Sequence, residues 1–558
     1  MAANAQVKVD PDRLFGRHLA VLGNTGSGKS CSVAGLIRWS LEEAKKVRGS
    51  DPNARFIILD PNGEYAKTFR DMGKVRVFAV DPSNTKGIHQ LQIPMWFWNS
   101  AEWCAFTQAS GKTQRPILRR ALREVRAGSD NLPSNEERKK LKLRRLLSGI
   151  LIQIQGALDK GVEKREATKF GFMLKAYLED LNLLKSRFTE FSEPYGKVVG
   201  ALATLIDSTQ KVTPSGDDYY FRGFTLIQLG PVRKALEEFV TDLGGIIYLQ
   251  GPEENCPLPF KGGDFADQIE LVAQQENVSQ FVDFLVMRIR TMLADEHIKS
   301  IAGEDQSILL GDWLETYFGS NLASNGTISV IDLSLVPSEV IHIVTAVIAR
   351  MILESLQRYR RMYGKILPTV LVMEEAHTFI KRYRDDSEEQ NASAVCCQVF
   401  EKIAREGRKF GLGLVLSSQR PSELSPTALS QCNTFLLHRI SNDKDQDLVS
   451  KLIPDNLRGL LRDLPSLPSR HALLLGWASE LPVLVQMNDL PSEQQPQSRD
   501  PDFWAVWSGE GLEKDSDGEV IERTVDWQEI AKDWQQTKIT SELKTHPLIE
   551  DQENSIAE

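Results

Sequence analysis

The sequence predicts an α/β fold in which a parallel sheet is covered by helices on both faces and interrupted by a large helical insertion. Short apolar runs alternate with amphipathic helical segments in two separated parts of the chain, as is typical of such sheets. A long charged stretch without such runs lies between the two parts. With 41% hydrophobic and 26% charged residues among 558, the chain has the composition of a folded globular protein.

The apolar runs place the expected strands at His18–Gly23, Phe56–Asp60, Ile328–Leu333, Thr369–Met373, Leu412–Ser417 and Thr434–Ile440. His471–Gly476 and Leu481–Met487 flank a short turn and predict a terminal hairpin. We therefore expect a first part of the core (1–100), a helical insertion (101–327), a second part of the core (328–490) and a partly flexible C-terminal extension (491–558). The extension should contain a helix at Trp527–Trp534 and a flexible tail from about Ser541.

Charge and composition limit the possible partners. The formal net charge of -9 excludes an overall basic surface, so any nucleic-acid contact must be local, such as a few donors per subunit lining the pore of a ring. The polar start of the chain and the lack of a long apolar run predict no signal peptide, no membrane span and a cytoplasmic location. Six cysteines without metal-ligand spacing predict reduced thiols: Cys31, Cys104, Cys256, Cys396, Cys397 and Cys432.

A glycine-rich loop fits the P-loop pattern in full, after an expected strand and before a helical run at Cys31–Ala44. Its glycines let backbone N–H groups surround a β-phosphate, and the helix N-terminus favours negative charge. Lys29 is expected to reach the β- and γ-phosphate oxygens, and the Ser30 hydroxyl to ligate Mg²⁺. The loop predicts ATP and Mg²⁺ as cofactors, bound by Gly23, Asn24, Thr25, Gly26, Ser27, Gly28, Lys29 and Ser30.

Two acids end the apolar strand Thr369–Met373, where a Walker B carboxylate must lie to reach a magnesium ion beside the P-loop. We expect Glu374 to hold the Mg²⁺ shell, and Glu375 to act as general base for the lytic water or to position it. Acids at strand ends are often merely solvated, so this assignment depends on the P-loop upstream.

The strand Leu412–Ser417 leads into Ser418-Gln419-Arg420-Pro421. Gln419 is the candidate sensor of the γ-phosphate, although such an amide can also simply satisfy backbone groups in a loop. A strand after the Walker B strand indicates the additional-strand class of RecA-like P-loop NTPases, which use a catalytic glutamate and usually work as rings. Simple nucleotide kinases are disfavoured.

Several charged residues have open assignments. Arg405 and Arg408 share a face of the helical stretch Ala392–Lys409, and one of them could reach a neighbouring subunit's ATP as an arginine finger; both could instead be cations placed favourably near a helix C-terminus. Asp60 and Glu64 are either site acids or turn formers. A charged loop after the Walker B strand faces either a central pore or solvent, and its cations are Lys381, Arg382 and Arg384.

Taken together, these motifs resemble the HerA family of the HerA–FtsK superfamily. The resemblance covers roughly Val7–Ser100 and Ile328–Met487. The combination of motifs is specific to the family, although each motif alone is not. It rests on Arg17–Leu22, Ile58–Tyr65, Glu374–His377, Gly407–Gly411 and Ser418–Ser422. A helical insertion also occurs in this family. Family members usually place a small β-barrel before the P-loop, where this chain has only the residues up to Leu22, so this chain is either a truncated version or a variant that docks its effector differently.

The resemblance implies a homo-hexameric, ATP-driven translocase or helicase on double-stranded DNA, working with a nuclease or another effector in DNA end processing or anti-phage defence. It implies Lys29, Ser30, Glu374, Glu375, Gln419 and either Arg405 or Arg408 as the site. Two alternatives stay open: a conjugation or secretion motor of the same superfamily, which the lack of a membrane span disfavours, and a nucleotide-stabilised ring that only holds effector subunits.

Overall fold

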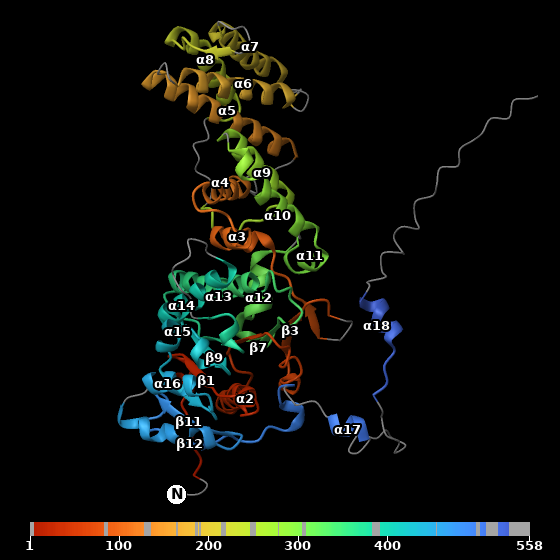
Figure 1. Cartoon of the computed structure of the whole chain (residues 1–558), viewed down its shortest axis with the longest axis vertical. Helices are drawn as coiled ribbons and strands as arrows, with labels where there is room; N and C mark the ends of the chain where they lie inside the picture. The colour runs from red at the N-terminus through yellow and green to blue at the C-terminus, as the bar shows by residue number, and fades with distance from the viewer. Residues whose placement is uncertain are drawn as a thin grey trace, which may run out of the picture. The chain divides into compact units, whose positions relative to one another are not determined.

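The computed structural model contains one ten-stranded sheet with helices on both faces (Figure 1). The structure describes residues 5–82, 87–127, 135–162, 166–184, 188, 191–213, 219–245, 253–276, 278–303, 308–381, 391–452, 455–497, 503–508 and 523–534. Two compact units are present, residues 1–497 and 498–558, and the sheet belongs to the first.

The strands follow the order β12-β11-β10-β1-β9-β8-β2-β7-β3-β4. All neighbours from β10 to β4 are parallel, whereas β10–β11 and β11–β12 are antiparallel. The bounds are β1 Leu19–Leu22, β2 Phe56–Asp60, β3 Val75–Ala79, β4 Ile88–Gln90, β7 Ile328–Asp332, β8 Thr369–Met373, β9 Leu412–Ser418, β10 Thr434–Leu437, β11 His471–Gly476 and β12 Val483–Gln486.

The predicted parallel sheet and its terminal hairpin are therefore confirmed, with corrections at the edges. β10 ends at Leu437 rather than Ile440, because the chain beyond it turns to contact the P-loop, where the Arg439 carbonyl accepts from Asn24 N. The second hairpin strand is shorter than expected, Val483–Gln486. β3 and β4, which lie at one edge of the sheet, were not predicted at all.

Alternating side chains of the central strands face two separate hydrophobic layers. In β1, Ala20 and Leu22 point to one layer, and Leu19 and Val21 to the other. The Leu19 layer contains helix α2, Lys29–Arg48, which begins two residues earlier than predicted. The remaining helices that cover the sheet or extend it are α1 Pro11–Phe15, α13 Ile341–Tyr363, α14 Ala392–Glu406, α15 Pro426–Ser430 and α16 Asp443–Leu452.

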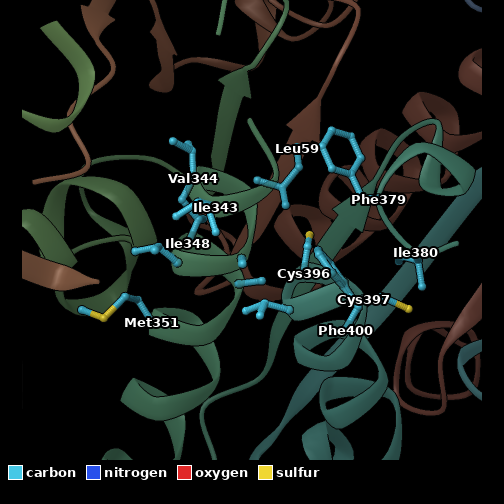
Figure 2. Close-up of a cluster of buried hydrophobic side chains, with 14 of the residues drawn as sticks. Leu59, Ile343, Val344, Ile348, Met351, Phe379, Ile380, Cys396, Cys397 and Phe400 are labelled. Atoms are coloured by element: carbon cyan, nitrogen blue, oxygen red, sulfur yellow. The ribbon is translucent and has the colours of Figure 1, made fainter. Parts of the chain in front are cut away.

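The second layer is formed mainly by α13 and α14. Figure 2 shows side chains of both helices close to Leu59 of β2, with Ile343, Ile348 and Phe400 among them. Cys396 and Cys397 are packed in the same layer, and all six cysteines are free thiols, as predicted. The apolar side chains of α13 are thus buried in the hydrophobic core of this domain.

The predicted helical insertion consists of ten helices in the described residues and one small hairpin that the sequence did not predict. Its elements are α3 Ser100–Phe106, α4 Gln114–Ala127, α5 Asn135–Lys160, α6 Ala167–Leu184, α7 Ser192–Thr209, β5 Gln210–Val212, β6 Tyr219–Phe221, α8 Leu226–Asp242, α9 Gly262–Gln275, α10 Asp283–Ala294, α11 Glu296–Ala302 and α12 Leu310–Phe318.

The insertion has two cores. Residues of α3, α4 and α9 to α12 belong to the same hydrophobic cluster as α13, whereas α5 to α8 enclose a separate cluster around Leu147, Leu202 and Leu236. A buried ion pair ties the first of these parts to the core: Arg350 of α13 contacts both carboxylate oxygens of Glu102 in α3, at 2.7 and 3.0 Å. The base of the insertion is thus continuous with the ATPase core.

The second unit contains two short helices, α17 Phe503–Ser508 and α18 Trp527–Trp534, the latter as predicted. The tail expected from Ser541 lies outside the described residues. Across the part of the chain that the structure describes, no helix is long and apolar enough to cross a membrane.

Candidate active site

The P-loop connects β1 to α2 at the carboxyl edge of the sheet. Gly28 has a left-handed conformation (φ 95°) directly before the helix. At the start of the loop, a Cβ on Gly23 would lie only 2.5 Å from the Cβ of His438, so only glycine allows this approach. The loop therefore needs these glycines for its own packing as well as for phosphate.

Lys29 is buried beside the loop, with its Nζ 2.9 Å from the carbonyl oxygen of Asn24. Burial lowers the pKa of Lys29, while the charges of Glu375, Glu374 and Glu64 oppose this shift. A buried ammonium and the free N–H groups of a helix N-terminus form a site for an anion. The residues present thus fit a nucleoside triphosphate, as the sequence predicts.

Glu374 directly follows β8 and is almost completely buried. Burial raises its pKa to about 7, although the nearby Ser417 hydroxyl and the hydrogen bond from Tyr65 oppose this effect. The Tyr65 hydroxyl donates to the Glu374 carboxylate and lies 3.1 Å from the carbonyl oxygen of Ser30. Tyr65 therefore holds the two predicted magnesium-binding residues, Ser30 and Glu374, next to each other.

Glu375 adopts a left-handed conformation (φ 44°, ψ 44°), which is uncommon for a residue with a side chain and turns it out of the strand direction. One carboxylate oxygen accepts from the side-chain amide of Gln419, and the other lies 3.2 Å from Nδ1 of His377. This second oxygen is buried and lacks a well-aligned hydrogen bond in the described structure. Although burial opposes the shift, His377, Gln419 and Lys29 hold the pKa of Glu375 below its usual value, so the carboxylate stays charged.

Gln419 links the acids to the P-loop. Its carbonyl oxygen accepts from the Thr25 hydroxyl, and its amide donates to Glu375. Gln419 follows β9, and β9 lies between β1 and β8. An extra strand between the P-loop strand and the Walker B strand defines the additional-strand class, so this is a P-loop NTPase fold of the predicted kind.

Asp60 and Glu64 have different positions. Asp60 is fully buried and its carboxylate accepts from the backbone N–H of Tyr65 at 2.8 Å, which makes it a turn former; burial raises its pKa to about 6. Glu64 is partly exposed and accepts a hydrogen bond from the side-chain amide of Asn62. Its negative charge opposes the lowering of the Lys29 pKa by burial. Both acids contribute negative charge near the candidate site, Asp60 beside Glu374 and Glu64 beside Lys29.

The two candidate finger arginines lie away from this site. The predicted helix Ala392–Lys409 ends at Glu406 as α14 and continues as a 3-10 turn, Gly407–Phe410. Arg405 lies in the last turn of α14, with half of its side chain exposed and 3.8 Å from Glu401. Arg408 is exposed and precedes β9, so it belongs to the amino edge of the sheet.

The candidate pore loop is only partly described. Lys381 is exposed and forms an isolated bridge with Leu424, whereas Arg382 and Arg384 lie outside the described residues. Sequence reasoning from single motifs missed Tyr65 and His377 as site residues, although both stand within the motifs quoted for the resemblance. Thr25 was predicted as a phosphate-binding residue, but its hydrogen bond with Gln419 was not.

A magnesium ion at this site would be held by few protein groups. In the described part of the chain, no cluster of three or more His, Cys, Asp or Glu side chains is arranged around a common point. In nucleotide sites, Mg²⁺ is coordinated by one or two protein ligands together with phosphates and waters. The Ser30 hydroxyl and Glu374 fit this role.

Known proteins share these features. A family model described as "Helicase HerA, central domain" matches residues 1–213. The DNA double-strand break repair helicase HerA of Pyrococcus furiosus is 24% identical over 506 residues, which cover 87% of this chain and 67% of that protein. The probable DNA double-strand break repair helicase HerA of Methanocaldococcus jannaschii is 26% identical over 487 residues, covering 87% and 74%. This chain thus matches about two thirds to three quarters of the length of these relatives.

Among solved structures, VirB4 of Thermoanaerobacter pseudethanolicus superimposes with a TM-score of 0.39 at 14% identity, covering 86% of this chain and 91% of that one. The residues matched by the family model include the P-loop, and the two relatives match 87% of the chain. The chain is thus similar to HerA helicases, through a family model over residues 1–213 and through relatives over 87% of its length, and it is a P-loop ATPase.

Proposed function

We propose that this chain is the motor subunit of a cytoplasmic homo-hexameric ring that hydrolyses ATP to move along double-stranded DNA. The ring would work with a nuclease or another effector in DNA end processing or anti-phage defence. The relatives named above are helicases of DNA double-strand break repair, which supports DNA as the partner. The observation that carries the proposal is the division of the site between the two edges of the sheet.

At the carboxyl edge, each subunit would bind one nucleotide. Lys29 and the amides of the P-loop would hold the phosphates, and Ser30 and Glu374 would hold Mg²⁺ beside them. Bound Mg²⁺ neutralises charge on the β- and γ-phosphates. Glu375 would take the proton of the attacking water, which its depressed pKa and its buried, unaligned oxygen allow.

Gln419 would report the state of the nucleotide. Its amide is shared between Thr25 of the P-loop and the base Glu375. A γ-phosphate beside Thr25 would compete for this amide and so release Glu375 toward the water. This arrangement favours turnover over a purely structural role for the nucleotide.

The positive charge of an arginine at the γ-phosphate would come from the next subunit. An arginine at the γ-phosphate stabilises charge in phosphoryl transfer, and Arg405 and Arg408 lie at the opposite edge from their own P-loop. In a ring, the amino edge of one subunit can face the carboxyl edge of its neighbour. One of the two arginines would then be the finger.

The distribution of charge is compatible with DNA binding by the first unit. Residues 498–558 contain six Lys and Arg against sixteen Asp and Glu, whereas residues 1–497 contain 61 against 60. The acidity of the whole chain therefore lies in the C-terminal extension. Because the ATPase unit itself is nearly neutral, the negative charge of the whole chain does not argue against DNA binding by this unit.

The DNA contact is proposed for the loop after β8, which contains Lys381, Arg382 and Arg384. Such contacts would be few per subunit and directed at phosphates, so binding should be independent of base sequence and should weaken steeply with salt. The loop follows the Walker B strand and would move with the nucleotide state.

The test is ATP hydrolysis by an oligomer of known size, with and without double-stranded DNA at two salt concentrations. The proposal expects stimulation by DNA, and expects the change of all three loop cations to alanine to lower this stimulation while basal hydrolysis is kept. Hydrolysis that DNA never stimulates would refute the motor. Unchanged affinity and stimulation in the triple variant would refute only the loop.

A further inference from the structure

A turn before β11, Ser469-Arg470, lies directly against the P-loop. The Ser469 hydroxyl donates to the carbonyl oxygen of Gly26 at 3.1 Å, and the backbone N–H of Arg470 donates to that of Ser27 at 3.1 Å. A Cβ placed on Gly28 would lie 3.3 Å from the backbone nitrogen of Arg470 and 3.6 Å from its Cγ. The stem of this arginine therefore lies beside Gly28, the last residue before α2, in the loop that would hold the phosphates of a nucleotide.

Arg470 has an unusual backbone conformation. Its φ is 66°, in the left-handed region that glycine adopts without cost and other residues avoid. Such conformations cost about 1–3 kcal/mol and occur preferentially at functional sites. In this active site the other non-glycine residue with positive φ is the proposed base, Glu375. A turn that needed only this backbone shape would be made more easily by glycine.

The ion pair that the Arg470 guanidinium forms is exposed and therefore weak. The guanidinium pairs with Asp489, and the two side chains are 43% and 73% exposed. An ion pair this exposed contributes about 0–1 kcal/mol, because water screens the charges. A phosphate group is a better partner for a guanidinium, since it accepts two parallel charge-assisted hydrogen bonds.

We propose that Arg470 is a nucleotide-binding residue of its own subunit, contacting the phosphate chain beside the P-loop. Without nucleotide, Asp489 holds the guanidinium; with nucleotide, a phosphate takes the place of Asp489. The turn would thereby form a second wall of the site. This inference rests on the proposed function in so far as the ligand is a nucleotide.

The arrangement also connects the site to the hairpin. The carbonyl oxygen of Arg470 accepts from the backbone N–H of Met487 at 2.9 Å, at the end of β12. Asp489 follows two residues later. Transfer of the guanidinium from Asp489 to a phosphate would therefore free the segment after β12, so nucleotide binding should loosen residues that follow Met487.

The experiment measures the affinity of the full-length protein for Mg²⁺–ADP and for a non-hydrolysable ATP analogue. Arg470→Ala should weaken both by about 10- to 100-fold, the range expected for a lost charge-assisted contact. Arg470→Lys should recover part of the loss. Asp489→Asn should instead tighten binding severalfold, because it removes the competitor.

Arg470→Gly separates the side chain from the backbone. Glycine relieves the strained conformation, so this variant should unfold at the same or a higher temperature than the wild type while it binds nucleotide as weakly as Arg470→Ala. A matched control is Arg13→Ala, which removes a cation that lies 4.0 Å from Glu480 at the other end of the same hairpin. That variant should bind like the wild type.

Wild-type affinity in Arg470→Gly would overturn the proposal, because the turn would then be only a structural support. Weaker binding in Asp489→Asn would overturn the competition between Asp489 and phosphate. If the wild-type protein itself bound no nucleotide, the proposed function would be refuted, and the role of Arg470 with it. A KM that rises in Arg470→Ala while kcat changes less would support a binding role.

Discussion

The two edges of the central sheet differ in what they can do alone. The carboxyl edge brings together Lys29, Glu374, Glu375 and Gln419. Gln419 bonds to both Thr25 and Glu375, Tyr65 bonds to Glu374, and Lys29 donates to the carbonyl oxygen of Asn24. The amino edge presents Arg405 and Arg408 to solvent with no phosphate-binding group of their own. β9 spans seven residues between Arg408 and Gln419, which at about 3.3 Å per residue is roughly 20 Å.

That separation is larger than any side chain can bridge. A subunit on its own thus has the groups that we propose bind nucleotide and activate water, but its two candidate finger arginines would not reach the phosphates of a nucleotide bound at its own P-loop. The comparison teaches that one sheet can carry two complementary half-sites, and that only contact between subunits would combine them.

The largest effect is expected at the carboxyl edge. Lys29→Ala should abolish measurable hydrolysis through loss of nucleotide affinity, because the ammonium contacts the phosphates. Glu375→Gln should also abolish turnover but keep nucleotide affinity, because a general base acts on the water; its contribution is typically about 10²- to 10⁴-fold. Equilibrium binding and steady-state hydrolysis, measured on both variants, separate the roles. An equal loss of affinity in the two would contradict them.

At the amino edge, loss of the finger should lower kcat by about 10³-fold or more without weakening nucleotide binding to the isolated subunit. Arg405→Ala and Arg408→Ala, made separately, identify which residue acts. The other variant is then the matched control and should keep most of the activity.

Mixing the inactive variants tests whether the finger acts between subunits. A subunit with Lys29→Ala still has its arginines, and a subunit without the finger still has its P-loop. Mixed rings should therefore recover part of the activity that each variant lacks alone. Absence of recovery in mixed oligomers of confirmed composition, or full activity in a monomeric wild-type preparation, would contradict the division of the site.

The carboxyl edge was predictable because each of its parts has a local signature. The P-loop, the strand ending in Glu374 and Glu375, and the strand before Gln419 can each be recognised within ten residues of sequence, and their strands have the predicted bounds to within one residue. Parallel strands end at a common edge, so these local patterns also predict that the residues meet.

What could not be predicted depends on contacts between distant residues. β3 contains Arg76, whose charge argues against a buried strand until one sees its guanidinium 3.0 Å from Ser329 Oγ in the neighbouring β7. The bridging role of Tyr65 likewise requires Glu374, far along the chain. The insertion was predicted as helical, but its division into two cores follows from packing that no local pattern encodes.

A smaller effect should appear in the pH dependence of Mg²⁺ binding at the carboxyl edge. Because burial raises the pKa of Glu374 to about 7, a proton competes with Mg²⁺ for this side chain near neutral pH. Mg²⁺ affinity measured with bound ADP should fall as the pH drops below 7, by up to about tenfold per pH unit. Glu374→Gln should remove this dependence, and a Mg²⁺ affinity that is constant between pH 5.5 and 8 would contradict it.

The stability of the nucleotide-free protein should change in the opposite direction. The folded-state pKa of Glu374 lies above its unfolded value, so the folded state binds the proton more tightly. The stabilising contribution is fully present at pH values below the unfolded pKa and is lost as the pH rises through about 7. Melting curves of the wild type and Glu374→Gln without Mg²⁺ should therefore converge at low pH and separate at high pH, with the wild type the less stable.

The smallest effect is expected for Tyr65→Phe, which removes one hydroxyl from between Ser30 and Glu374 and keeps the ring packed on Phe69. A hydrogen bond to a charged group contributes about 1.5–3 kcal/mol, but water can replace the hydroxyl when nucleotide is bound. We expect Mg²⁺ affinity to fall severalfold, because Glu374 is no longer held toward Ser30. The Tyr65 hydroxyl also lowers the pKa of Glu374, so the variant should lose Mg²⁺ at a higher pH than the wild type. Titrating Mg²⁺ into the ADP complex at several pH values measures both effects. If affinity fell equally at every pH, the hydroxyl would position Ser30 alone, and Glu374 would be independent of it.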